Sequence, residues 1–148
     1  MENPKVPHKK RDTEEKMAIW DYAAYFHDGQ ILEIDHEMNN VVVFMESSEL
    51  DLEDFKEDIK LTKDEYFKGK LHIEGVKSIR INGIRFFRKI EKEAKCNSIL
   101  RFKVEDLTVF LYVEWQPPAP RNPDFSAFEI EAEKIWWENL PDLEDPFE

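Results

Sequence analysis

The stretch Tyr25-Phe26-His27-Asp28-Gly29-Gln30 is where the chain changes from a helical pattern to a strand pattern. Asp-Gly is a frequent turn pair, because both residues tolerate the backbone angles of tight turns. We therefore expect a short N-terminal helix that begins near Thr13, where a threonine side chain can cap it, and ends near Tyr25. Gly29 is expected to take a positive φ in the turn, since glycine has no Cβ to oppose it.

A β-hairpin is predicted directly after this turn. Ile31, Leu32 and Ile34 indicate a strand that ends near His36. Asn39-Asn40 suits a tight turn, because asparagine adopts positive φ more readily than most residues. The run 41–45 (VVVFM) is β-prone and apolar on both faces, as expected of a central strand.

The remaining chain continues this β pattern. Strand patterns occupy 71–74, 76–81, 98–104, 107–115 and 128–133, with turns expected at Asn82-Gly83 and Glu105-Asp106. In 98–104, strict alternation places Ile99 and Arg101 opposite Leu100, Phe102 and Val104. The segment 84–90 fits either a strand or helical turns, 50–59 fits a short helix, and four prolines in 117–123 indicate an irregular crossing. The predicted fold class is mainly β: an antiparallel sandwich or partly open barrel of about seven strands with a short N-terminal helix.

Composition places these elements in a single domain. The chain has 148 residues, of which 13% are aromatic, enough for a hydrophobic core. We expect a flexible leader at 1–12, one β-rich domain at 13–140 and an acidic tail at 141–148. No apolar run has the roughly 18 residues of a membrane span, and no secretory signal is recognisable. With Cys96 as the only cysteine, no internal disulfide can form, so a cytoplasmic location is expected.

The net charge of −12 is unevenly distributed. Residues 17–45 carry five acids and no base, and residues 46–65 carry nine acids and three bases, whereas residues 77–103 carry nine bases and two acids. The basic segment alternates with phenylalanines, as in some nucleic-acid-binding surfaces. The total charge would nevertheless repel a phosphate backbone, which argues against a nucleic-acid partner.

The sequence has no motif that identifies an enzyme. There is no G-x-S-x-G, phosphate loop or dinucleotide fingerprint, and four glycines cannot form a glycine-rich cradle. His27-Asp28 could form a base with its orienting acid, but this pair is better explained as part of a turn. His27, His36 and His72 stand at no metal-ligand spacing. We therefore expect a non-enzymatic protein without metal or cofactor.

Protein binding is the favoured alternative. Of the adjacent tryptophans Trp136 and Trp137, one must point away from the core if both lie in a strand, and exposed tryptophan is typical of interface anchors. The acidic run after the predicted hairpin would steer a basic protein partner. The expected partner-binding residues are Glu46, Glu49, Asp51, Glu53, Asp54, Glu57, Asp58, Trp136 and Trp137.

A sequence motif supports the same class. Trp20 followed by Phe26-His27-Asp28-Gly29, a hairpin, and then Gly69-Lys70-Leu71-His72-Ile73-Glu74-Gly75-Val76 resembles small bacterial β-sheet families whose chains open with a W…FHD element. Some of these families are immunity proteins of polymorphic toxin systems. The resemblance covers the first half of the chain and implies an immunity-type inhibitor that binds a basic toxin.

Two other functions remain open at this stage. One is a small-molecule-binding or metal-binding β-barrel protein, including an enzyme, that uses His27, His36 or His72. The other is a homodimer formed through an apolar tryptophan surface.

Overall fold

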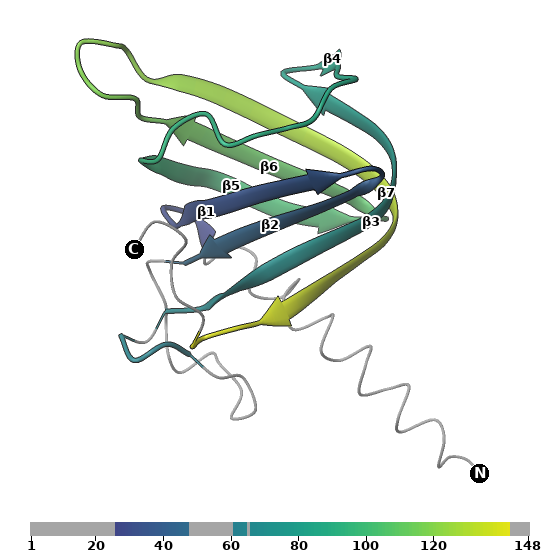
Figure 1. Ribbon diagram of the computed structural model, residues 1–148, viewed down its shortest axis with the longest axis horizontal. Coiled ribbons are helices and arrows are strands. Elements are labelled where there is room, and N and C mark those ends of the chain that lie inside the picture. The colour runs from purple at the N-terminus through teal and green to yellow at the C-terminus, as the bar shows by residue number, and fades with distance from the viewer. Residues whose placement is uncertain (1–25, 48–60, 65, 143–148) are drawn as a thin grey trace.

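The computed structural model describes residues 26–47, 61–64 and 66–142. This part of the chain is mainly β and forms seven antiparallel strands in one open sheet (Figure 1). The strands are β1 (Gln30–Glu37), β2 (Asn40–Glu46), β3 (Lys68–Ile81), β4 (Ile84–Arg85), β5 (Asn97–Glu105), β6 (Thr108–Trp115) and β7 (Asp124–Asn139). Their order in the sheet is β1-β2-β3-β7-β6-β5, and β4 pairs with β3. The helices expected at 13–25 and 50–59 lie outside the described residues.

The pair of long strands β3 and β7 connects the two halves of the sheet. They have 14 and 16 residues and pair from Gly69↔Asn139 to Ile81↔Phe128. β2 pairs with the first half of β3, whereas β6 pairs with the first half of β7. Figure 1 shows both strands curving around one side of the molecule, so that the sheet curls around its core.

The bend in β3 lies at Gly75. This residue has φ of 66°, and the register of β3 against β7 shifts between Val76 and Ser78. The turn between β1 and β2 contacts β3 at this bend, because Val76 N–H donates to the carbonyl of Asn39 at 2.8 Å. The prediction of two separate strands at 71–74 and 76–81 was wrong, since a bulge bends one continuous strand without ending it.

The two edge strands of the curled sheet meet at one end. Asp28 N–H donates to the carbonyl of Ile99, and Ile99 N–H donates to that of Gly29, at 2.7 and 2.8 Å. The buried amide of Asn97 extends this contact, because its Oδ1 accepts from Ile31 N–H at 2.7 Å and its Nδ2 donates to the Ile31 carbonyl at 3.0 Å. One asparagine side chain therefore replaces a strand partner for Ile31.

The segment 86–96, here named the crossing segment, runs along β1 from His36 toward Ile31. Ile90 is buried, and its N–H donates to Nδ1 of His36 at 3.0 Å. Lys92 Nζ donates to the carbonyl of Leu32 at 2.9 Å. Burial lowers the pKa of the Lys92 ammonium, and the Glu33 carboxylate partly opposes this shift. Of the residues 84–90, whose structure the sequence left open, only Ile84 and Arg85 form a strand.

An aromatic cluster fills one part of the core. Phe26, the first residue of the FHD element, is fully buried, and its ring centroid lies 5.5 Å from those of Phe67, Phe102 and Trp137. Edge-to-face rings at such distances stabilise a core beyond the effect of their buried area. The FHD element therefore has a packing role at Phe26.

Several turns differ by one residue from their predicted positions. Asp28, with φ of 66°, takes the positive angle expected of Gly29, and Met38, with φ of 56°, takes the one expected at Asn39-Asn40. Gly29 is needed for another reason, because a Cβ there would collide with the carbonyl of Glu46. The turn between β5 and β6 lies at Asp106-Leu107 instead of the predicted Glu105-Asp106.

Alternation in β5 is interrupted by a bulge at Leu100. The register against β6 shifts between Ile99 and Arg101, so Ile99 and Phe102 are both buried although they are three residues apart. The prediction that Ile99 and Phe102 lie on opposite sides was wrong, because a bulge adds one residue to the alternation.

We expect Asn97→Ala to lower the free energy of unfolding by about 1–3 kcal/mol, because it leaves buried backbone groups of Ile31 without this partner. Urea denaturation measures the change. Asn122→Ala is the matched control, since Asn122 is exposed, and should change stability by less than about 0.5 kcal/mol. Equal stability of both variants would contradict the role assigned to Asn97.

Candidate functional site

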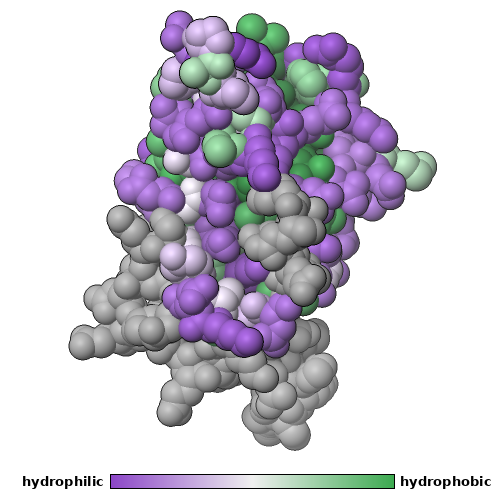
Figure 2. Space-filling view, turned by 60° about the vertical axis from the view of Figure 1, so that its left-hand side comes forward, coloured by the Kyte–Doolittle hydropathy of each residue, from purple (hydrophilic) through white to green (hydrophobic). Residues whose placement is uncertain are grey.

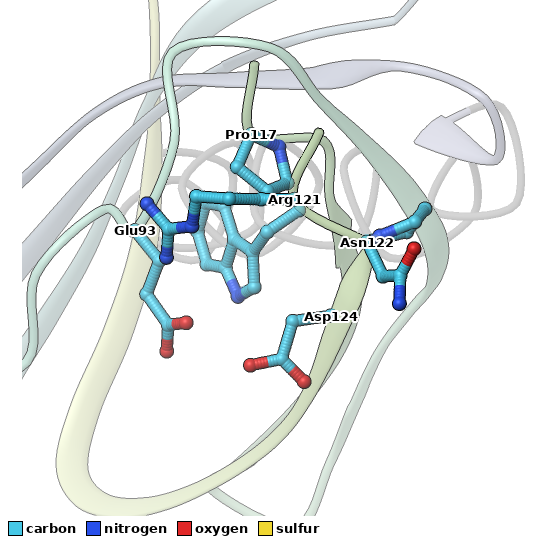
Figure 3. A pocket seen from close by; sticks show the side chains of 7 residues that line it. Glu93, Pro117, Arg121, Asn122 and Asp124 are labelled. Carbon is cyan, nitrogen blue, oxygen red and sulfur yellow. The ribbon is translucent and has the colours of Figure 1, made fainter. Parts of the chain in front are cut away.

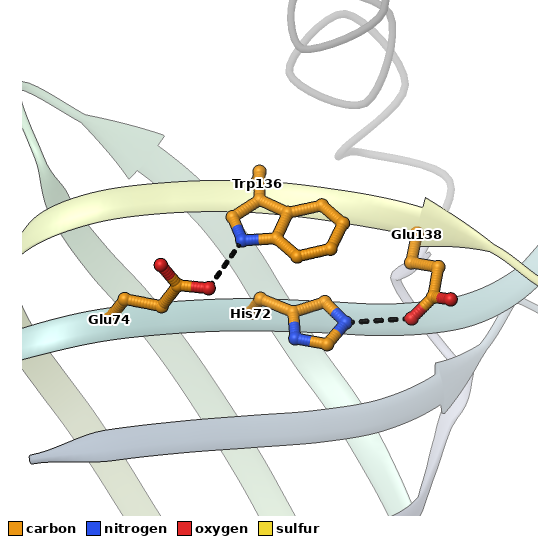
Figure 4. Close-up of polar contacts among 4 residues, drawn as sticks. All are labelled: His72, Glu74, Trp136 and Glu138. Atoms are coloured by element: carbon orange, nitrogen blue, oxygen red, sulfur yellow. Dashed lines mark hydrogen bonds and ion pairs between the residues drawn. The ribbon is translucent and has the colours of Figure 1, made fainter.

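The outer face of β3 and β7 carries a polar cluster formed by His72, Glu74, Trp136 and Glu138 (Figure 4). Leu71 and Ile73 are fully buried in the core, so the alternate residues of β3 point outward. Trp136 stands opposite His72 in the β3–β7 register and therefore lies on the same face. Strand pairing thus brings together residues that are far apart in the sequence.

The rings of His72 and Trp136 are stacked. Their centroids are 4.0 Å apart and their planes differ by 7°. The indole Nε1 of Trp136 donates to Glu74 Oε2 at 2.8 Å, and Nε2 of His72 lies 2.8 Å from Glu138 Oε1. Figure 4 shows each ring held by one carboxylate at its edge. The half-buried Trp136 is therefore held in one orientation by the His72 ring and the Glu74 carboxylate.

Strand register extends this cluster to the edge of the sheet. Val42 stands between Asp35 and His72, and Phe44 stands between Glu33 and Lys70. The outward positions of β1, β2, β3 and β7 therefore share one face of the sheet, which we name the acidic face, and Phe44 is a buried position within it. Its accessible carboxylates belong to Glu33, Asp35, Glu37, Glu74 and Glu138, and its accessible ammonium groups belong to Lys70 and Lys134. Glu46 and Lys68 are on the same face but are almost completely buried.

The acidic face combines negative charge with a fixed aromatic ring. Its three β1 carboxylates are exposed, Val42 provides apolar surface beside Asp35, and Trp136 provides apolar surface on β7, two strands further along the sheet. Lys70 Nζ lies 5.8 Å from the centroid of the Phe44 ring, so the side chain of this lysine lies over its neighbour in β2. Lysine and arginine side chains of a partner could pair with the carboxylates while their stems pack on the apolar residues.

The structure places only part of the predicted partner-binding set. Glu46 is 9% exposed and pairs with Gln30 and Lys68 in the sheet, so it contributes little to an open surface. Glu49, Asp51, Glu53, Asp54, Glu57 and Asp58 lie outside the described residues. The partner-binding role of these seven acids stays a prediction.

The two tryptophans have different roles in the structure. Trp137 packs against Phe26 and Phe67, with ring centroids 5.5 and 5.2 Å away. Trp136 lies on the outer face, and this agrees with the expectation that one of the pair points away from the core. Of the two proposed anchors, both of which are half-buried, Trp137 therefore packs against the core and Trp136 lies on the outer face.

The three histidines considered for a chemical site do not converge. His27 lies in the turn before β1 and His36 near its far end, and His72 lies on the opposite face of the sheet from His36. His27 Nδ1 is 3.3 Å from Asp28 Oδ2, but both side chains are more than half exposed. Among the described residues, no group of three His, Cys, Asp or Glu side chains is arranged to hold a metal ion.

A hollow of about 330 Å³ lies under the proline-rich loop between β6 and β7. Figure 3 shows Glu93, Arg121 and Asp124 around it, and Trp115 is also one of its lining residues. The indole Nε1 donates to Ser126 Oγ at 2.8 Å, and this hydroxyl donates to Glu93 Oε2 at 3.2 Å. Since these groups already bind one another, they join the crossing segment to β6 and β7.

Sequence reasoning missed all five carboxylates of the acidic face. For Glu33, Asp35 and Glu37 the signal was present, because these residues alternate with Ile34 and His36 at the period of a strand. Their position on the same face as Trp136 depends on the sheet order, which local patterns do not contain.

Comparison with known proteins gives no relative. No family model matches the chain, and neither a curated protein nor a solved structure matches it. Within the described residues, no helix is long and apolar enough to cross a membrane.

We expect His72 and Trp136 to stabilise the sheet as a pair. In a double-mutant cycle with His72→Ala and Trp136→Ala, the coupling energy should be about 0.5–1.5 kcal/mol, the range of stacked ring pairs. Urea denaturation of the four proteins measures it. The control cycle pairs His72→Ala with Tyr112→Ala, a partly exposed aromatic residue on β6, and should give a coupling near zero. Equal coupling in the two cycles would contradict a specific stack.

Proposed function

We propose that this protein is a non-enzymatic acidic protein-binding module, and that it inhibits a basic toxin in the manner of an immunity protein. The observation that carries the proposal is the acidic face, on which five carboxylates share one side of the sheet with a tryptophan that stacks on His72 and donates a hydrogen bond to Glu74. A rigid aromatic ring loses little conformational entropy on binding, as is typical of interface anchors.

Charge supports a basic partner. The chain carries a net charge of −12, and the carboxylates of the acidic face outnumber its ammonium groups. Opposite charge on two partners accelerates their association and disfavours partners of the same charge. The resemblance of the W…FHD opening to families that include immunity proteins favours a toxin as that partner.

The proposal is tested by affinity capture from the native host with four baits. These are the wild type, Trp136→Ala, the neutralised variant Glu33→Gln/Asp35→Asn/Glu37→Gln, and the control Glu105→Gln/Glu114→Gln/Glu129→Gln. The wild type and the control should retain the same basic protein. Both test variants should retain at least about tenfold less of it, the loss expected for interface hot spots. Quantitative mass spectrometry measures the amounts.

Two results would contradict the proposal. One is equal capture of the basic protein by the wild type and the neutralised variant, which would place the binding surface elsewhere. The other is the absence of any protein captured specifically by the wild type. The inhibitor role requires a further result, namely that the captured protein loses its own activity when the wild type is added in equimolar amount.

A further inference from the structure

A second surface, whose rim includes two exposed cations, lies at the other side of the sheet. The crossing segment, the end of β3 and β7 together line a hollow of about 440 Å³. We name it the cationic hollow, after the exposed Arg88 and Lys89 at its rim. Its apolar lining comes from Ile81, Phe86, Ile90 and Phe128, and its charged lining comes from Arg88, Lys89, Glu91 and Glu93.

The apolar residues of the cationic hollow are firmly held. Ile90 and Phe128 are 3% and 2% exposed and belong to the hydrophobic core. Phe86 N–H donates to the carbonyl of Ile79 at 2.9 Å, which fixes the crossing segment at the rim. The floor is therefore the surface of the core itself, and the volume is sufficient for one large hydrophobic side chain.

The cations at the rim are available to a partner. Arg88 stacks on Phe86, with its guanidinium carbon 5.3 Å from the ring centroid. Within the described part of the chain neither Arg88 nor Lys89 forms an ion pair, and both side chains are exposed. A stacked guanidinium keeps its N–H donors in a fixed plane, which suits bidentate binding of a carboxylate.

Exposed hydrophobic residues continue beyond the hollow. Ile84 and Phe87 in and after β4 are 71% and 82% exposed, and Arg85 stacks on Phe87 at 5.4 Å. Figure 2 shows hydrophobic residues exposed among hydrophilic ones in the upper part of the molecule, the end at which Figure 1 places β4. Exposed phenylalanine and arginine together are enriched in protein interfaces.

We propose that the cationic hollow binds an acidic peptide segment of a partner protein, with a large hydrophobic side chain of that segment in the hollow and its carboxylates on Arg88 and Lys89. This surface and the acidic face take partners of opposite charge. The inference is therefore independent of the function proposed above.

The charge layout favours a peptide over a nucleic acid. Electrostatic attraction between exposed groups fades beyond the Debye length of about 8–10 Å. A short acidic segment in the hollow is therefore influenced mainly by the charges of the lining, in which Arg88 and Lys89 offset Glu91 and Glu93. A nucleic acid extends much further and would also meet the field of the whole chain, whose net charge of −12 repels its phosphates.

The test uses an array of synthetic decapeptides with a central phenylalanine or tryptophan. In one set this residue is flanked by glutamate and aspartate, in a matched set by glutamine and asparagine. The labelled wild-type protein should bind the acidic set at least about tenfold more strongly, because charged groups form the stronger hydrogen bonds. An oligouridine RNA is tested in parallel.

Three variants locate the binding surface. Arg88→Glu/Lys89→Glu should lower binding to the acidic set at least about tenfold, whereas the control Lys63→Glu/Arg101→Glu makes the same charge change elsewhere and should stay within about twofold. Glu91→Gln should strengthen binding about twofold, since it removes a like charge from the rim. Thermal unfolding shows whether each variant is folded. If Arg88→Glu/Lys89→Glu is not folded, Arg88→Gln/Lys89→Gln takes its place in the experiment.

The proposal is overturned by any of three results. The first is no preference of the wild type for the acidic aromatic set. The second is unchanged binding by the folded Arg88/Lys89 variant. The third is tighter binding of the oligouridine RNA than of every acidic peptide, which would assign the cations to phosphate.

Discussion

The pairing of β3 with β7 is the constraint on which the structure depends. These strands are long enough to serve both halves of the sheet, and they remain paired through the bend near Gly75. The bend allows the outer strands to turn toward each other and enclose a single core. The same pairing places Trp136 opposite His72, so the alignment that forms the core also forms the polar cluster on the outer surface.

The alternation of apolar and polar residues predicted most strands, because each strand has one face on the core. β6 is the clearest case, with Val109, Leu111, Val113 and Trp115 all buried. The same reasoning gave wrong predictions for β3 and β5, because each of these strands contains a bulge. The residue inserted at a bulge changes the side of the sheet on which every later side chain lies. Turn chemistry identified where most hairpins turn but not which residue takes the unusual φ, as Met38 demonstrates.

The candidate site was less predictable than the fold. Local patterns indicated that one of the two adjacent tryptophans would lie outside the core, but the choice of Trp136 depends on the register with β3. The carboxylates that hold the two rings, Glu74 and Glu138, are 64 positions apart and come together only through that register. The sequence also indicated a basic segment but not the apolar hollow beside it, which requires β7 to lie alongside the crossing segment.

The contact between Asn97 and Ile31 has a consequence for solubility. The free edge of a β-strand is a template for pairing with other chains, and proteins protect such edges to avoid aggregation. Here the side chain of Asn97 occupies backbone groups of β1 at one end, and His36 and Leu32 bind the crossing segment along the remainder. The segment that carries the cationic hollow thus also shields an aggregation-prone edge. Changes to its surface residues can be tolerated, whereas its deletion would expose that edge to neighbouring molecules.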